Sequence, residues 1–478
     1  MRRRYGFTLI ELLAVIVVLG IIVLVIAPNF MDAIFTARQS GYKETLMGVL
    51  RAVSQDSAEY DYNRHMYEIK NGKIVYNDEK IDYNGSIEGN GTIEIDLKGN
   101  TKIEASNGQF CGIKPFKSSE IIVKDAGECP KIADTSGAST PELLANMYPV
   151  VWDASQGSWV IASEANYENN EWYNYGEKRW ANAITVTPSQ REKYRTAKVG
   201  DVVDPVDVVG YYVWIPRFQY RAFTTGPTEI EISFNLGTTR DESLITHPAF
   251  RFGGREISGF WVGKFETTGT SDQPTVLPNV TPISGESLNT YFESSRSFST
   301  STASRQGFNE RKSDTHLMKN SEWGAVAYLS HSKYGTLKEI TANGSGKTGG
   351  GNYRSNVAQS TTGNIYGVYD MSGGVGEYVM GNNLGEIGES HMSELPETKY
   401  YDYYSSYSAT NYEVSLNGDA VKEVATWYGD TAQMVTSAQP WFIRGGAGSG
   451  ATSGIFSFSS GTGTYNAQVG YRVTVIAI

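Results

Sequence analysis

The chain lacks both the basic surface that nucleic-acid binding requires and the clustered histidines of a metalloenzyme. Its 52 acidic residues outnumber its 41 lysines and arginines, which leaves a net charge of −11. Because phosphate backbones are bound by positively charged surfaces, we expect no nucleic acid among its partners. The five histidines stand singly, without the close spacing of zinc or iron ligands. The sequence therefore predicts no metal cofactor.

Cysteine is almost absent, with Cys111 and Cys129 as the only two. A structural zinc site needs four closely spaced ligands, and no histidine lies near this pair. Outside the cytoplasm, two lone cysteines usually form a disulfide. We predict a disulfide between Cys111 and Cys129, with zinc as the alternative.

Tryptophan is missing from the first 151 residues, whereas all nine tryptophans lie between Trp152 and Trp441. The composition changes near residue 140. Residues 131–142 are rich in Ser, Thr, Gly and Pro, and no apolar residue repeats there. Such a stretch is typical of a linker. We therefore expect one folded part before residue 131 and a second one over residues 143–478.

One long apolar run, Phe7 to Ala27, stands near the N-terminus and carries a single charge, Glu11. It is long enough to cross a bilayer, which takes about 20 residues. A buried carboxylate costs several kcal/mol unless a cation neutralises it, so a simple anchor has no use for Glu11. We predict that the segment packs against copies of itself, with Glu11 bound to a neighbouring N-terminal amine. Arg2 to Arg4 should stay in the cytoplasm, which places the rest of the chain outside.

This N-terminus resembles the class III signal of type IV pilins and pseudopilins. A basic leader, residues 1–6, ends in Gly6, and Phe-Thr-Leu-Ile-Glu follows over residues 7–11. The resemblance implies cleavage between Gly6 and Phe7 by prepilin peptidase, and methylation of the new N-terminal Phe7. It also implies a cytoplasmic membrane location before assembly, and an extracellular pilus or cell-surface location afterwards.

An amphipathic helix should continue the apolar run, so that residues 7–62 form one long helix. Residues 63–130 then alternate short strand-like stretches with turns. The clearest are two hairpins, over residues 66–76 and 91–105. A helix that carries a small antiparallel sheet and a disulfide loop resembles the globular head of pilins in its layout.

Three later stretches resemble the formylglycine-generating (sulfatase-modifying factor) family, which has a C-type lectin fold. They are GFWVGKFETT (259–268), NIYGVYDMSGGVGEYVMGN (364–382), and FIRGGAGSG (442–450) with VGYRVTVI (469–476). The resemblance implies an α+β, C-type-lectin-like domain over residues 143–478. The matching residues are Gly367, Tyr369, Asp370, Met371, Gly373, Glu377, Arg444, Gly445, Gly446, Gly470, Tyr471 and Arg472.

The catalytic chemistry of that family does not carry over. Its copper-binding cysteines should lie between the last two stretches, and residues 447–469 contain none. We therefore expect a binding domain without catalytic residues, since a fold alone does not imply a function. A near match to a phosphate-binding loop at residues 341–348 lacks its first glycine, and we interpret it as a flexible, solvated loop. A structural calcium ion in loops such as 271–279 is left open, although no loop has calcium-ligand spacing.

The segment 447–468 is the best candidate for ligand contact because it joins two framework strands and consists of small, polar and aromatic residues. Phe456, Phe458 and Tyr465 could supply contact area, and Asn466 could supply hydrogen bonds. In this fold the stretch resembles the variable region of retroelement-diversified ligand-binding proteins. The alternative is a plain hairpin in which Phe456 and Phe458 are buried.

Together these features predict a minor or tip type IV pilin that displays an adhesin-like domain at the cell surface. A domain of several hundred residues would crowd the shaft of a filament, which argues against a major pilin. The alternatives are a pseudopilin of a type II secretion or DNA-uptake machine, a structural cap without a ligand, and, disfavoured, an enzyme on a pilin stalk. The expected partners are other pilin subunits, prepilin peptidase, the membrane and a surface glycan or protein.

Overall fold

The computed structural model describes residues 8–60, 64–70, 72–77, 79–96, 98–223, 226–234, 241–302, 304–448, 450 and 452–478, with the backbone alone for residues 20 and 22–31. The chain divides into two compact units. Unit 1 contains Met1–Ile95 and Gly99–Pro130, and unit 2 contains Asp96–Lys98 and Lys131–Ile478. Each unit has its own hydrophobic core.

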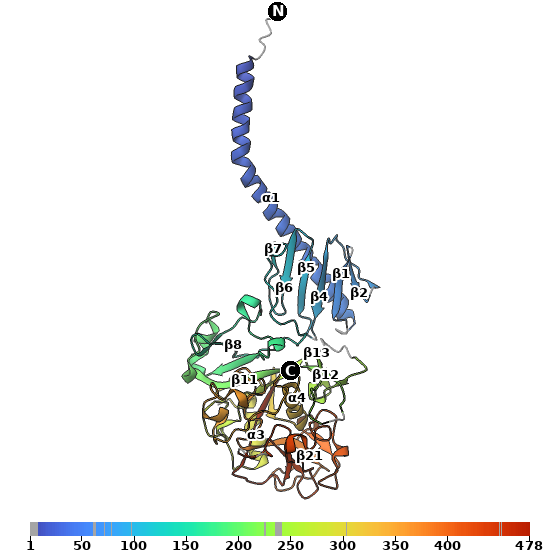
Figure 1. The fold of residues 1–478 in the computed structure, drawn as a ribbon, viewed down its shortest axis with the longest axis vertical. Helices are drawn as coiled ribbons and strands as arrows, with labels where there is room; N and C mark the ends of the chain where they lie inside the picture. The colour runs from blue at the N-terminus through green and yellow to red at the C-terminus, as the bar shows by residue number, and fades with distance from the viewer. Residues whose placement is uncertain are drawn as a thin grey trace, which may run out of the picture. The chain divides into compact units, whose positions relative to one another are not determined.

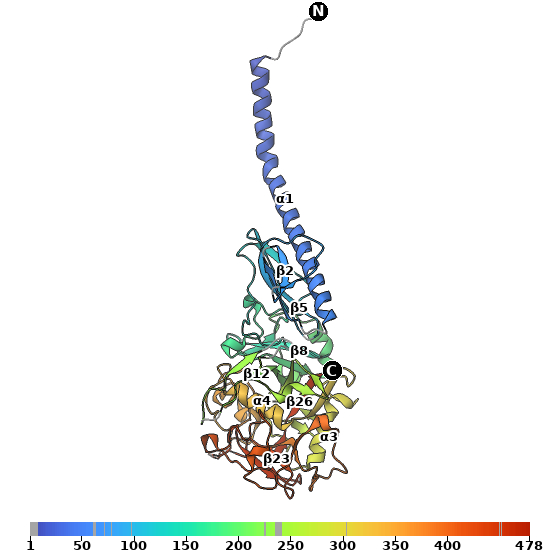
Figure 2. The ribbon, with the colours of Figure 1, turned by 90° about the vertical axis from the view of Figure 1, so that its right-hand side faces the viewer.

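Unit 1 consists of one long helix and one antiparallel sheet. Helix α1 spans Leu9–Glu59, and the strand order of the sheet is β3-β2-β1-β4-β5-β6-β7. The C-terminal half of α1 lies along this sheet and the N-terminal half extends beyond it (Figures 1 and 2). The strands are β1 (Met66–Lys70), β2 (Lys73–Tyr76), β3 (Glu79–Lys80), β4 (Asn90–Ile95), β5 (Thr101–Ser106), β6 (Phe110–Lys114) and β7 (Ile122–Asp125).

One apolar face of α1 holds the helix to the sheet. The apolar residues of α1 recur at helical spacing, and those in the second half of the helix, from Tyr42 to Val53, are buried. Each fully buried aliphatic side chain contributes about 1.5–3 kcal/mol to folding. The main contributors to this core are Leu46, Val49 and Val53 from α1, and Ile69, Ile93, Ile103 and Phe110 from the sheet.

Both predicted hairpins of unit 1 are present. In the first, Lys70 lies opposite Lys73, which leaves a two-residue turn. Gly72 in this turn has a φ of 75°, a left-handed conformation that glycine adopts without strain; Asn71 lies outside the described residues. In the second, β4 pairs with β5, and Ile95 lies opposite Thr101.

Unit 2 contains two larger sheets. The first has the order β20-β26-β17-β11-β10-β8-β9 and is antiparallel throughout. The second has the order β22-β21-β23-β24, with β25 also paired to β21; β22 and β25 run parallel to β21. Their strands are β8 (Met147–Asp153), β9 (Ser158–Ile161), β10 (Asn182–Val186), β11 (Val208–Pro216), β17 (Gly259–Gly263), β20 (Ser313–Leu317), β21 (Gly376–Asn383), β22 (Asp402–Tyr404), β23 (Trp441–Arg444), β24 (Phe458–Gly461), β25 (Val469–Tyr471) and β26 (Val473–Ala477).

Within its described residues, unit 2 also contains a small three-stranded sheet, two strand pairs and three α-helices, besides short 3₁₀ helices. Every residue of helix α4 is buried, so it is a core helix. The α+β class with mostly antiparallel sheets is confirmed. These elements are β12 (Phe218–Tyr220), β13 (Ile232–Phe234), β14 (Ile245–Thr246), β15 (Arg251–Phe252), β16 (Arg255–Glu256), β18 (Thr268–Thr270), β19 (Gln273–Thr275), α2 (Arg191–Arg195), α3 (Leu288–Thr300) and α4 (Asn320–Ser330).

Residues 131–142 differ from the predicted linker, because they belong to unit 2. The Ala133 N–H donates to the Asn166 carbonyl at 3.0 Å, and the Ser139 carbonyl accepts the indole N–H of Trp214 at 3.1 Å. Their polar composition predicts a solvated chain, but hydrogen bonds to distant residues fix the backbone instead. The buried members are Ile132, Ala133, Asp134, Ser139 and Thr140.

Candidate functional site

Thr8 and Glu11 form a capping box at the start of α1. The Glu11 carboxylate accepts hydrogen bonds from the Thr8 N–H at 2.9 Å and the Thr8 hydroxyl at 2.8 Å. In return, Thr8 Oγ1 accepts the Glu11 N–H at 3.3 Å. The carboxylate is therefore held at the helix N-terminus, where its negative charge suits the helix dipole. The predicted cleavage residues Gly6 and Phe7 come directly before this cap, outside the described residues.

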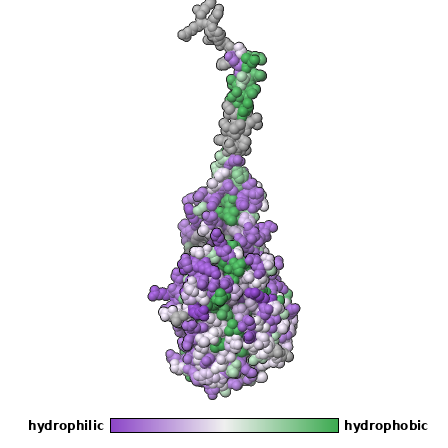
Figure 3. Space-filling model, turned by 90° about the vertical axis from the view of Figure 1, so that its left-hand side faces the viewer, coloured by the Kyte–Doolittle hydropathy of each residue, from purple (hydrophilic) through white to green (hydrophobic). Residues whose placement is uncertain are grey.

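The described apolar side chains that follow the cap are exposed, and Figure 3 shows them as a hydrophobic surface on the extended half of α1. An exposed apolar surface of this kind marks a site of contact with protein or lipid. No helix within the described residues is both long and apolar enough to cross a membrane. Phe7 and several side chains of the predicted span lie outside that part of the chain. The side chains at least 50% exposed are Leu9, Ile10, Leu12, Leu13, Val15, Ile16, Val17, Val18, Leu19 and Ile21.

The predicted disulfide is confirmed. Cys111 on β6 is bonded to Cys129, and their Cα atoms are 6.0 Å apart. The bond ties the segment after β7 back to β6, so the last strand of unit 1 is closed into a covalent loop.

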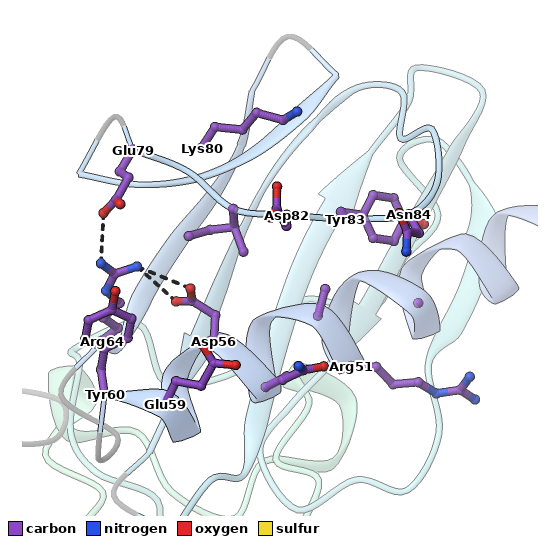
Figure 4. A pocket seen from close by; sticks show the side chains of 14 residues that line it. Arg51, Asp56, Glu59, Tyr60, Arg64, Glu79, Lys80, Asp82, Tyr83 and Asn84 are labelled. Carbon is purple, nitrogen blue, oxygen red and sulfur yellow. Dashed lines mark hydrogen bonds and ion pairs between the residues drawn. The ribbon is translucent and has the colours of Figure 1, made fainter.

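A groove of about 620 Å³ runs between α1 and residues 79–84 of unit 1 (Figure 4). The α1 wall presents small and polar residues at helical spacing, which places them on one face. Arg64 closes one end: its guanidinium lies 2.8 Å from Glu79 and 3.2 Å from Asp56, and 3.7 Å above the ring of Tyr60. The lining residues from α1 are Gly48, Arg51, Ala52, Gln55, Asp56 and Glu59.

Charges of both signs line this groove. Arg51 and Lys80 supply positive charge, and Glu59 and Asp82 supply negative charge. Figure 4 shows the Arg51 side chain directed away from the ion pairs of Arg64. A groove with mixed charge suits a polar segment of another protein better than a single ion. The sequence did not predict this groove, because it depends on the approach of residues 79–84 to a helix about 30 positions earlier.

Phe456 and Phe458 are buried in the core of unit 2, contrary to their predicted role as ligand contacts. The Phe456 ring lies 5.2 Å from that of Trp427 and 5.6 Å from that of His331. Phe458 belongs to β24 and lies opposite Arg444 of β23. For these two residues the alternative, a hairpin with buried phenylalanines, is the better description. Burying an aromatic ring lowers the free energy of the folded state more than a solvent-exposed ring does.

Tyr465 and Asn466 lie on the surface, as expected of ligand contacts. Tyr465 is 53% exposed, and its ring lies 4.9 Å from that of His391 in a T-shaped arrangement. The Asn466 side chain accepts the Gln468 N–H at 2.9 Å, and its carbonyl accepts the Gly285 N–H at 3.0 Å. Asn466 therefore shapes the turn, whereas Tyr465 offers free aromatic surface.

The residues that carry the second family resemblance form a buried polar framework. The Arg472 guanidinium donates to both carboxylate oxygens of Glu377, at 2.6 and 3.1 Å, and to the carbonyls of Gly263 and Tyr369. Asp370 accepts the Gly349 N–H with both oxygens at 2.9 Å. These charged groups connect strands and loops, and they are inaccessible to a ligand.

Two carboxylates hold the fully buried imidazole of His316. Asp314 Oδ1 lies 2.9 Å from Nδ1, and Glu322 Oε1 lies 3.0 Å from Nε2. Burial disfavours the charged imidazole, but the attraction of both carboxylates outweighs it, so the pKa of His316 is raised above its usual 6.5. Burial also raises the pKa of each carboxyl, yet contact with His316 more than offsets this and lowers both. The other charged or titratable groups around them are Arg296, Lys319, Tyr400 and Asp402.

The contribution of this His316 cluster to the free energy of unfolding of unit 2 should be largest between about pH 4.5 and 6.5. The contribution of His316 is complete below pH 6.5 and is lost as the pH rises through its raised folded pKa. The contribution of Asp314 and Glu322 is complete above pH 4.5 and is lost as the pH falls through their lowered pKa values. Each group adds a slope of at most about 1.4 kcal/mol per pH unit.

Urea unfolding followed by tryptophan fluorescence measures this directly, because all nine tryptophans belong to unit 2. His316→Asn should make the alkaline decline less steep, whereas His391→Asn, at an exposed histidine, should keep its slope. An unchanged alkaline decline in His316→Asn would contradict the assignment.

A family model described as "Prokaryotic N-terminal methylation motif" matches residues 1–27. The predicted prepilin motif is thereby confirmed. It supports a type IV pilin or pseudopilin, and it implies pilin partners and processing by prepilin peptidase. Among solved structures, the chain is similar to Treponema denticola variable protein 1, with 13% identity, 58% of this chain and 97% of that chain covered, and a TM-score of 0.23. Comparison with curated proteins gives no match.

Proposed function

We propose that the chain is a minor or tip subunit of a type IV pilus that displays unit 2 as a ligand-binding domain. The prepilin motif at residues 1–27 carries this proposal, since it directs a chain into the membrane and then into a filament. The exposed apolar surface of α1 supports the same role, because it needs protein or lipid around it. The subunit is inserted in the cytoplasmic membrane before assembly and reaches the cell surface afterwards.

The size of unit 2 supports a tip or sparse position. Its span from Lys131 to Ile478 is far longer than unit 1, and a domain of this size on every subunit would obstruct lateral contacts in a shaft. We assign unit 2 a C-type-lectin-like fold of the formylglycine-generating type and a binding role without catalysis. The support is the order of its signature residues and the absence of cysteine from residues 447–469.

Mass spectrometry of filaments sheared from the cell surface tests the proposal. The N-terminal peptide should begin at Phe7 and carry an N-methyl group, and Gly6→Leu should leave the leader in place because the peptidase needs a small side chain at that position. Tyr5→Phe is the matched control and should be processed normally. An intact Met1 in assembled protein would refute the pilin assignment. Processed protein that never appears in surface filaments would instead favour a pseudopilin.

A further inference from the structure

A left-handed glycine turn in unit 2 lines a cavity of about 370 Å³. Gly349, Gly350 and Gly351 have φ values of 61°, 64° and 81°, a run that glycine adopts without strain. The cavity next to this turn is walled by Pro278, Asn279, Gly351, Asn352, Tyr353 and Arg354. The stretch follows the near match to a phosphate-binding loop, which the sequence indicated as flexible and solvated.

Hydrogen bonds fix this turn before any ligand arrives. Thr348 exchanges backbone hydrogen bonds with the segment after β19: it donates to Val280 and accepts from Asn279, both at 2.9 Å. The Gly349 N–H is bound by Asp370, and the Gly350 carbonyl accepts the Asn356 amide at 2.9 Å. A turn that is held in this way loses little conformational entropy on binding.

The groups left over at the cavity are donors. Within the described part of the chain, the backbone N–H groups of Asn352, Tyr353 and Arg354 donate to no acceptor. Successive backbone N–H groups that have no acceptor within the chain are available to bind an anion.

Arg354 supplies a positive charge at the same cavity. Its guanidinium lies 5.2 Å above the Trp152 ring and 5.9 Å from the Tyr353 ring, so two aromatic residues hold it in position. The side chain is exposed, and no described carboxylate lies within ion-pair distance of it. A guanidinium without a carboxylate presents a planar fork of donors that matches an oxyanion.

We infer that this cavity binds an oxyanion group, a sulfate, phosphate or carboxylate carried by an extracellular polymer. Arg354 neutralises the charge, and the backbone N–H groups of residues 352–354 donate to its oxygens. The inference depends on the proposed surface display in one respect: display at the cell surface is the reason to expect an extracellular polymer as the ligand. The site itself belongs to unit 2 and lies in a different part of the sequence from Tyr465.

Isothermal titration of the full chain in detergent micelles tests the site. The probes are inorganic sulfate, inorganic phosphate, acetate, dextran sulfate, polygalacturonate and uncharged dextran. The protein has a net charge of −11, which disfavours nonspecific binding of polyanions. We expect at least one anionic probe to bind and uncharged dextran not to bind. Comparison of the Kd values for the small ions and the charged polymers identifies the preferred oxyanion.

Variants decide whether the binding belongs to this cavity. Arg354→Gln should raise the Kd at least tenfold. Arg311→Gln, at an exposed arginine elsewhere in unit 2, should leave the Kd unchanged. Equal binding by Arg354→Gln and the parent, no binding by any probe, or an equal loss in Arg311→Gln would each overturn the inference. The titration does not depend on cleavage at Gly6, so its failure is distinguishable from failure of the pilin assignment.

Discussion

Glu11→Val should remove the chain from assembled filaments while its membrane insertion stays intact. The substitution makes the apolar run more hydrophobic, so insertion has no energetic reason to suffer. Assembly loses the carboxylate that we propose neutralises a neighbouring N-terminal amine. Losing one partner of a buried charge pair costs about 3–5 kcal/mol, so incorporation should fall on the order of a hundredfold or more. Quantitative blotting of membranes and of sheared filaments measures both quantities.

A second substitution separates the charge of Glu11 from its capping role. The capping box at Thr8 needs only an acceptor, which glutamine also supplies. Glu11→Gln should therefore keep the helix cap yet assemble as poorly as Glu11→Val. Glu44→Val, at an exposed glutamate farther along α1, should assemble normally. If Glu11→Gln assembles like the parent, capping rather than charge explains the residue.

Arg472→Met should lower the free energy of unfolding of unit 2 by about 3–5 kcal/mol, because it leaves the buried carboxylate of Glu377 without a cation. The carbonyls of Gly263 and Tyr369 lose their donors at the same time, which adds the cost of unpaired polar groups. Urea titration followed by tryptophan fluorescence isolates unit 2, since unit 1 contains no tryptophan.

The matched double variant distinguishes an ion pair from simple loss of volume. Arg472→Met with Glu377→Leu removes both charges, so it should be more stable than Arg472→Met alone. Arg311→Met, at an exposed arginine, should change the free energy of unfolding by less than about 0.5 kcal/mol. A double variant less stable than the single one would show that packing, not charge, dominates at this position.

Local patterns in the sequence predict unit 1 well. The apolar spacing of α1, the hairpin at 66–76 and the Cys111–Cys129 bond depend on neighbours in sequence or on a single pair, and all three are present. The prepilin motif is equally local, since one short stretch carries it. Periodicity and turn residues suffice for such features because few alternatives compete with them.

Tertiary contacts decide what the sequence mispredicts in unit 2. Residues 131–142 have the composition of a linker, but a hydrogen bond to the Asn166 carbonyl and one from the Trp214 indole fix them. From its sequence context, Phe456 could lie in the core or on a contact surface. It lies in the core because Trp427 and His331, which are distant in sequence, pack against its ring. The cavity beside Arg354 needs residues 278–279 next to 351–354, which no local pattern reveals.

The disulfide of unit 1 has a mechanical consequence. Tension between a filament and a bound ligand would enter unit 1 from the chain just after Cys129. Because Cys129 is covalently tied to Cys111, that force passes through the sulfur bridge into β6 and bypasses β7. The edge strand therefore cannot be peeled away, and residues 112–128 add no length to a stretched molecule. Pulling experiments should show a longer extension of unit 1 only after the disulfide is reduced.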